Sequence, residues 1–230
     1  MIIHKINFPI YGIIILLSVI IGCIYIYLNL KKEGINKKYI LYYFLMFIPF
    51  AFVMGKIYTM IVNINKGIDI CHAGLSAYGG LLGVVIASII YEYIIPSDKK
   101  FIKYTVLSLP LIYGCTKIAC SIVGCCHGIP YTGPLAVNYI DVLDQLVFPV
   151  QMLEVILDLI LFLVLNKLKK KKNIIYTSLI SVTVIKFLTD FLRFDHTKVI
   201  ITPNQIFSIG LIIVVIIIYI VKTKDIRHKN

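Results

Sequence analysis

Seven long apolar segments, separated by short polar connections, occupy most of this 230-residue chain. A bilayer core about 30 Å thick is crossed by a helix of about 20 mainly apolar residues. We therefore predict an all-α polytopic membrane protein with seven transmembrane helices in one domain covering residues 1–230. The predicted spans cover about residues 10–30, 39–63, 75–95, 103–123, 149–166, 174–192 and 203–221.

Composition supports this prediction. Apolar residues make up 60% of the chain and the mean hydropathy is +0.93, whereas about half apolar is typical of soluble domains. The first apolar run is too long for the central region of a signal peptide and no small-residue cleavage site follows it. We therefore expect it to remain as a helix.

Basic residues are segregated between the two sets of connections. The connections after the first, third, fifth and seventh spans hold 16 of the 23 Lys and Arg residues. The opposite side holds only Lys5, Lys66, Arg193 and Lys198. The positive-inside rule then places the amino terminus outside and the carboxyl terminus in the cytoplasm. Topology and anionic lipid head groups account for the net charge of +12, so we expect no nucleic-acid partner.

Several charged residues fall inside the predicted spans, where one charge costs about 2.5–3.5 kcal/mol at the helix centre. At 1.5 Å per residue, the three lysines among them lie about 10 Å below the outer surface. One interpretation is that ion pairs only hold helices together, or that the lysines reach to the interface. Their common depth favours a shared polar cavity. Its predicted members are Lys56, Lys117, Lys186, Glu154 and Asp190, beside Tyr78 and Gln151.

Three glycines, Gly79, Gly80 and Gly83, form a surface without side chains near the outer end of the third span. Small residues of this kind allow close helix packing in membranes. The alternative is a groove that lets a lipid head group or acyl chain approach the backbone, with Tyr78 at its rim.

Cys120 lies near the end of the fourth span, and Cys125, Cys126 and His127 follow it. The spacing lacks the two Cys-x-x-Cys-like pairs typical of zinc sites, so we predict no metal. A structural disulfide or plain buried thiols are one alternative. Reactive thiol chemistry is another, because Lys117 and His127 would lower a thiol pKa.

Six motifs occur in order between about Ala51 and Gly210. They are Met54-Gly55-Lys56, Tyr78-Gly79-Gly80-Leu81-Leu82-Gly83, the stretch Lys117 to Gly128, Pro149-x-Gln151-x-x-Glu154, the stretch Lys186 to Arg193, and Gln205. Together with the seven spans and their orientation, this order resembles the prolipoprotein diacylglyceryl transferase family. Lysine replaces the family's arginine at 56, 117 and 186, tyrosine replaces histidine at 78, and Cys120 and Cys125 replace asparagine and glutamate.

The resemblance implies an enzyme that moves a diacylglyceryl group from phosphatidylglycerol to a thiol acceptor and releases glycerol phosphate. It implies no cofactor. In this reading Lys56, Lys117, Lys186 and Arg193 hold the phosphate. The residues assigned to catalysis are Tyr78, Lys117, Lys186 and His127, and those assigned to substrate binding are Lys56, Gly79, Gly80, Gly83, Cys120, Gly124, Cys125, Cys126, Gly128, Gln151, Glu154, Asp190 and Arg193.

The expected partners are an anionic phospholipid donor and a thiol-bearing protein or peptide acceptor. The expected location is the plasma membrane of a bacterium, and the expected state is a monomer. Two alternatives stay open: a lipid-binding membrane protein that has lost catalysis, and a thiol-based transferase or redox protein that uses the cysteine cluster.

Overall fold

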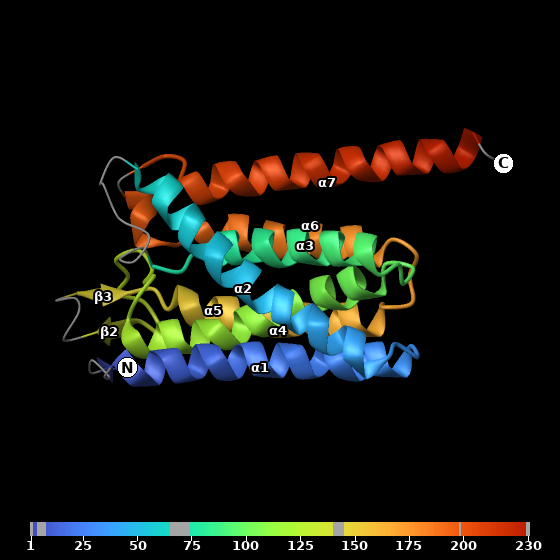
Figure 1. The fold of residues 1–230 in the computed structure, drawn as a ribbon. Coiled ribbons are helices and arrows are strands. Elements are labelled where there is room, and N and C mark those ends of the chain that lie inside the picture. The colour runs from blue at the N-terminus through green and yellow to red at the C-terminus, as the bar shows by residue number, and fades with distance from the viewer. Residues whose placement is uncertain (1, 4–7, 65–73, 140–144, 198, 229–230) are drawn as a thin grey trace. The chain divides into compact units, whose positions relative to one another are not determined.

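Helices dominate the computed structural model, which describes residues 2–3, 8–64, 74–139, 145–197 and 199–228. Each predicted span coincides with one helix in these ranges (Figure 1). They are α1 (Phe8–Lys32), α2 (Lys37–Val62), α3 (Ala77–Ile94), α4 (Lys100–Val123), α5 (Val150–Lys167), α6 (Ile174–Asp190) and α7 (Pro203–His228). The largest difference is in α7, which continues to His228 because no glycine or proline interrupts its basic tail.

Five of the helices in the described residues, α1, α2, α3, α4 and α7, are long and apolar enough to cross a membrane. Charges weaken the case for α5, because Glu154, Asp158 and Lys167 all fall within its 18 residues. Length weakens the case for α6, which has 17 residues. The apolar helices identify an all-α, multi-pass membrane protein.

The chain divides into two compact units, which are described one at a time: residues 20–109, and residues 1–19 together with 110–230. In the unit of residues 20–109, α2 packs against α3. The buried Tyr43 of α2 hydrogen-bonds Thr105 and, at 2.8 Å, Ser88. These hydroxyl groups satisfy one another where no water is available.

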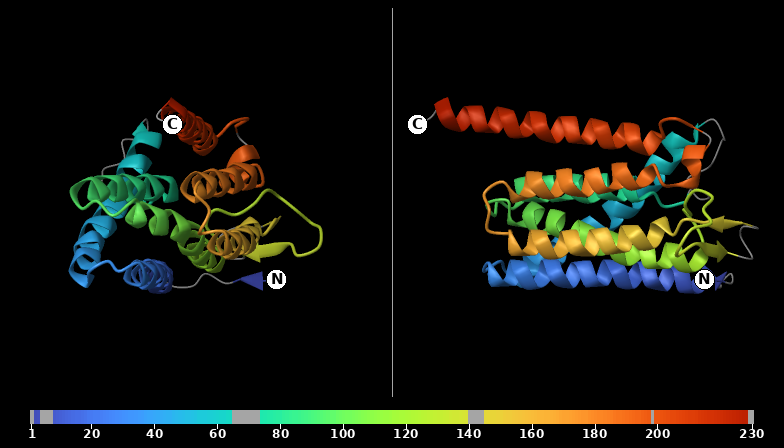
Figure 2. Two further views of the ribbon diagram at one scale, coloured as in Figure 1. Left: turned by 90° about the vertical axis from the view of Figure 1, so that its right-hand side faces the viewer. Right: turned by 180° about the vertical axis from the view of Figure 1, so that it is seen from behind.

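In the other unit α6 packs between α5 and α7, and the three helices run side by side (Figures 1 and 2). Buried polar side chains occupy the facing surfaces of α5 and α6. Those of α5 are Gln151, Glu154 and Asp158, and those of α6 include Thr183, Lys186, Thr189 and Asp190. Gln151, Glu154, Lys186 and Asp190 belong to the polar group predicted from the sequence, and its description as a shared cavity stays a prediction.

A small three-stranded sheet, with one strand before α1 and two between α4 and α5, is absent from the sequence prediction. β2 (Val137–Tyr139) pairs in parallel with β1 (Ile2–Ile3) and antiparallel with β3 (Leu146–Val147). Val137, Tyr139 and Val147 form a buried cluster on it. Strands of two or three residues are too short to show an alternating pattern, so no pattern in the sequence predicts them.

Candidate active site

A buried carboxylate joins two cations from different elements. Glu154, in the first turns of α5, lies with Oε2 2.5 Å from Nζ of Lys117 in α4. Its Oε1 accepts a hydrogen bond of 3.1 Å from Nη2 of Arg193, which follows the end of α6. Lys117 and Glu154 are 3% and 1% exposed, so solvent screens this pair little. Burial opposes the charge on Arg193, but Glu154 keeps the pKa of the guanidinium well above its ordinary value.

A third cation, Lys186 of α6, shares an aromatic neighbour with Lys117. The Nζ atom of Lys186 is 2.9 Å from the ring centroid of Tyr113, and that of Lys117 is 5.1 Å from it. Asp158, one turn beyond Glu154, is fully buried and interacts electrostatically with Lys186. A side chain built at Gly114 would lie 3.2 Å from Cβ of Asp158, so the glycine lets α4 approach α5 here.

Asp190 closes the network at the end of α6. Its Oδ1 lies 3.8 Å from Nη1 of Arg193, and its Oδ2 accepts a hydrogen bond from the hydroxyl of Thr202. Thr202 in turn accepts a hydrogen bond of 3.2 Å from the backbone N–H of Gln205 at the start of α7. Ion pairs and hydrogen bonds therefore link α5, α6 and the start of α7.

Two glycines shape the turn after α4. Gly124 has φ of +75°, and a Cβ there would lie 2.8 Å from Cδ1 of Tyr139. A Cβ at Gly128 would lie 3.0 Å from Cβ of Phe148 and from the carbonyl oxygen of Leu192. Any side chain at either position would push the turn away from its neighbours.

Side chains and backbone fix the same turn in place. The amide of Gln151 donates a hydrogen bond of 2.9 Å to the carbonyl oxygen of Cys125. The backbone N–H of Phe194 donates to the carbonyl oxygen of His127 at 3.1 Å, and that of Ile129 donates to Leu192 at 3.0 Å. The turn is thereby anchored both to α5 and to the segment that carries Arg193.

The three thiols of this turn lie together, with their sulfur atoms all within 4.8 Å of one another. The pKa of Cys126 lies well below its ordinary value because Cys120 and Cys125 donate hydrogen bonds to its sulfur. The same contacts raise the pKa of Cys125. The five cysteines in the described residues are free thiols, and Cys71 lies outside those residues. The cluster therefore offers three soft ligands close together.

His127, predicted to assist proton transfer, faces its own turn. Its Nδ1 lies 3.3 Å from the carbonyl oxygen of Gly124, and its ring centroid is 5.2 Å from that of Phe194. Its Nε2 is buried and has no hydrogen-bond partner among the described residues. That nitrogen can exchange a proton with a bound molecule.

The remaining predicted site residues belong to the unit of residues 20–109. Lys56 lies with Nζ 5.5 Å from the ring centroid of Phe52, and Tyr78 stacks on Tyr58 with ring centroids 6.1 Å apart. Their place in a cavity with Lys117 stays a prediction.

The glycine surface of α3 contacts α2 closely. A Cβ at Gly79 would lie 2.6 Å from Cβ of Tyr58, and one at Gly83 would lie 2.9 Å from Cβ of Met54. Gly80 is less crowded, with its nearest contact, the carbonyl oxygen of Ala51, at 3.8 Å. This geometry favours the helix-packing interpretation of Gly79 and Gly83.

Sequence reasoning missed three residues of the site. Tyr113 was detectable because it precedes Lys117 by four residues on one helix, a spacing that brings side chains together. Thr202 stands directly before Pro203, a combination typical of a helix start. No sequence pattern pointed to Tyr139, because only the fold brings it next to Gly124.

Comparisons with known proteins point to one family. The profile of the prolipoprotein diacylglyceryl transferase family matches residues 1–221. A Finegoldia magna protein named phosphatidylglycerol–prolipoprotein diacylglyceryl transferase is 30% identical over 94% of this chain and 92% of its own. Proteins of the same name from Clostridioides difficile and Clostridium tetani are 26% and 28% identical, over 80% and 56% of this chain and 78% and 55% of their own.

Proposed function

The chain belongs to the prolipoprotein diacylglyceryl transferase family, and from this premise we propose that it transfers a diacylglyceryl group from phosphatidylglycerol to a protein thiol. The acceptor would be the cysteine of a prolipoprotein, as the names of its relatives indicate. The other product would be glycerol phosphate.

One observation carries this proposal: Arg193 and Lys117 flank Glu154, and the buried Nε of Arg193 has no hydrogen-bond partner among the described residues. A buried donor without a partner is costly, so such a group indicates a missing acceptor. A phosphate oxygen suits it, because guanidinium groups bind phosphate through charge-assisted hydrogen bonds. Lys117 would bind a second oxygen of the same phosphate.

In this reaction the acceptor thiolate attacks the carbon of the diacylglyceryl group that is bonded to the phosphate. The carbon–sulfur bond forms as the carbon–oxygen bond breaks, and the electron pair leaves with glycerol phosphate. Lys117, Lys186 and Arg193 would stabilise the charge that develops on the leaving phosphate. Glu154 and Asp190 would hold Lys117 and Arg193 in position.

The thiol proton needs an acceptor near the reacting sulfur. His127 is a candidate because its Nε2 has no hydrogen-bond partner in the described part of the chain. Tyr78 is the second candidate and lies in the unit of residues 20–109, as does Lys56, which we propose as a further phosphate ligand. Gly79, Gly80 and Gly83 would then support Tyr78, and a lipid contact at Gly80 remains part of the proposal.

We propose seven spans, an outside amino terminus, a cytoplasmic carboxyl terminus and a single domain in the plasma membrane of a bacterium. The distribution of Lys and Arg supports the orientation, and the bacterial relatives support the location. Of the four basic residues assigned to the outer side, Arg193 is described, and Lys5, Lys66 and Lys198 lie outside the described residues. We expect a monomer, which cross-linking in membranes would test.

The reaction can be tested with purified protein, phosphatidylglycerol and a peptide with one cysteine, followed by mass spectrometry. We expect a diacylglyceryl thioether and an equal amount of glycerol phosphate. Replacing Arg193 by Gln should lower the rate at least about 100-fold, because one phosphate ligand contributes several kcal/mol to such a transition state. The exposed Lys170→Gln is the matched control and should keep the wild-type rate.

The same assay separates the alternatives. If the protein binds phosphatidylglycerol but forms no thioether, the transferase proposal fails and the protein is a lipid-binding protein. Two findings together would favour the thiol-based alternative. Activity would be lost when Cys120, Cys125 and Cys126 are all changed to Ser, and one of these cysteines in the wild-type protein would carry a diacylglyceryl group or a disulfide.

A further inference from the structure

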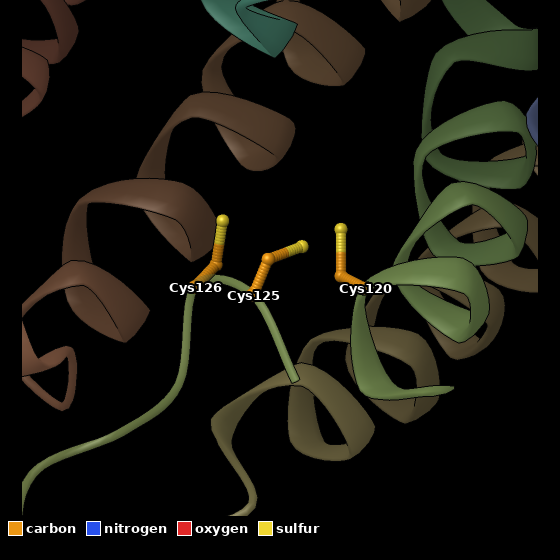
Figure 3. Close-up of side chains that lie close together, drawn as sticks. All are labelled: Cys120, Cys125 and Cys126. Carbon is orange, nitrogen blue, oxygen red and sulfur yellow. The ribbon is translucent and has the colours of Figure 1, made fainter. Parts of the chain in front are cut away.

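Three sulfur ligands converge where α4 ends. Cys120 comes from the last turn of α4, and Cys125 and Cys126 from the turn that follows. In the view of Figure 3 the side chains of Cys120 and Cys126 point in the same direction, and the sulfur of Cys125 lies between the other two and is directed toward Cys120. The Sγ atoms all lie within 4.8 Å of one another. Zinc–sulfur bonds of about 2.3 Å place the sulfurs of one tetrahedral site roughly 3.8 Å apart, so small side-chain rotations would close the site.

We propose that Cys120, Cys125 and Cys126 bind one zinc ion through three thiolates and leave its fourth tetrahedral position open. This site goes beyond the proposed transfer reaction, which needs no metal. The sequence spacing disfavoured zinc because the usual pattern takes ligands from two Cys-x-x-Cys-like pairs. Here a helix end and a reversed turn bring the ligands together instead.

The backbone holds the ligands before any metal binds. Cys126 has φ of +55° and Gly124 has φ of +75°, so the chain turns back on the end of α4. A positive φ at a non-glycine residue is unfavourable and persists where the surroundings impose it. The surroundings here are the hydrogen bonds from Gln151 to Cys125 and from the N–H of Gly124 to the carbonyl of Cys120.

Neighbouring charges suit a thiolate site. Three thiolates and one Zn²⁺ carry a net charge of −1, which needs a nearby cation. Lys117 lies three residues before Cys120 on α4, and Arg193 pairs through its backbone with Gly128, two residues after Cys126. The hydroxyl of Tyr11 also hydrogen-bonds Cys120, the kind of outer contact that orients a metal ligand.

The ligand set selects the class of metal. In the described residues the group contains three sulfurs and no imidazole or carboxylate. Magnesium and calcium prefer oxygen ligands, and iron–sulfur clusters are usually held by four cysteines. Thiolates favour Cu(I) and zinc. Cys126 is exposed, so a fourth ligand can reach the ion from outside, as at zinc sites with three protein ligands.

The test uses tag-free protein kept reduced with a phosphine, which supplies no competing thiol. Zinc alone is titrated in against a chromophoric chelator, and cadmium alone is used to observe thiolate-to-metal charge transfer. We expect one zinc per chain, and no binding when all three cysteines are changed to Ser. Cys126→Ser alone should weaken binding at least about tenfold, since one of three ligands is lost. Cys115→Ser, in the same helix but outside the cluster, should bind zinc like the wild type.

Further arms test the coordination. A small thiol added to the cadmium form should raise the charge-transfer intensity by about one third, because four thiolates would replace three. Zinc binding that survives the triple substitution, or a wild-type protein that binds no zinc, would overturn the site. If Cu(I) saturates the site and zinc does not bind, the assignment to zinc is wrong. If the small thiol leaves the charge-transfer intensity unchanged, the fourth coordination position is not open. None of these readouts depends on transfer activity.

Discussion

Lys117 and Arg193 are joined by one carboxylate: Nζ of Lys117 lies 2.5 Å from Oε2 of Glu154, and Nη2 of Arg193 lies 3.1 Å from its Oε1. Thr189 donates a further hydrogen bond of 3.1 Å to the same Oε1. The carboxylate therefore fixes the distance between two cations on different elements. Its removal should affect both the fold and the binding of an anion.

Glu154→Gln should destabilise the protein by about 3–5 kcal/mol, because it leaves two buried cations without their shared counter-charge. The transfer rate should fall at least about 100-fold, since Lys117 and Arg193 would no longer be held at a fixed distance from each other. Thermal unfolding in detergent and the thioether assay measure the two effects.

A double-mutant cycle isolates the pair. Lys117→Met combined with Glu154→Gln should cost less than the sum of the two single changes, because each removes the partner of the other. A coupling free energy near zero would contradict a direct role for the 2.5 Å contact.

Gly124→Ala should destabilise the turn by about 1–2 kcal/mol, the approximate cost of a left-handed conformation in a residue with a Cβ. The contact of 2.8 Å with Cδ1 of Tyr139 adds to this cost. Gly12→Ala in α1 is the matched control: nothing lies within 4 Å of a Cβ there, and alanine favours helix. The control should melt at or above the wild-type temperature, and equal destabilisation of both variants would refute this account of Gly124.

The helices could be predicted because a membrane leaves the backbone few choices: a long apolar segment must satisfy its own hydrogen bonds as a helix. Lys117, Lys186 and Glu154 could be predicted as site residues for the same reason, since charge in such a segment is costly. The short strands had no comparable signal. Their pairing is set by contacts across the fold, such as Val137 with Val147.

The thiol cluster shows a different limit. Spacing rules describe ligand pairs on recurring motifs, and a positive φ at Cys126 has no signature in the sequence. The glycines of the motifs could be singled out from the sequence, but the neighbour that each of them contacts could not be predicted. Gly79 and Gly83 face α2, whereas Gly124 and Gly128 admit Tyr139 and Phe148.

Glu33 should make stability depend on pH. Its carboxylate accepts a hydrogen bond of 2.5 Å from Tyr104 and lies 3.6 Å and 3.9 Å from Nζ of Lys100 and Lys103, all in the unit of residues 20–109. Hydrogen bonding by Tyr104 lowers the pKa of Glu33, and the two lysines lower it further. A pKa that is lower in the folded state gives stability that is present above the unfolded value of about 4.3 and is lost as the pH falls through the folded pKa.

Glu33→Gln should therefore lower the melting temperature slightly at pH 7, by the equivalent of a few tenths of a kcal/mol, because the group is partly exposed and screened. The difference from the wild type should shrink in acid below the unfolded pKa. Melting curves of both proteins across pH 3–7 check the sign, and a difference that grows in acid would contradict it.

Thr202→Val should weaken the junction of α6 and α7. The hydroxyl of Thr202 donates to the buried Asp190 and accepts from the N–H of Gln205. Valine removes the partner of Asp190, whereas the N–H of Gln205 keeps its hydrogen bond of 3.0 Å to the carbonyl oxygen of Thr202. An unsatisfied buried group costs about 1–3 kcal/mol. Asp190 also lies 3.8 Å from Arg193, so transfer should fall about tenfold if that contact positions the guanidinium.

Thr202→Ser keeps the hydroxyl and is the matched control, expected to stay within about 1 kcal/mol of the wild type. Melting temperature and the thioether assay test both variants, and a Val variant as active and stable as the Ser variant would show that the junction does not depend on this hydroxyl.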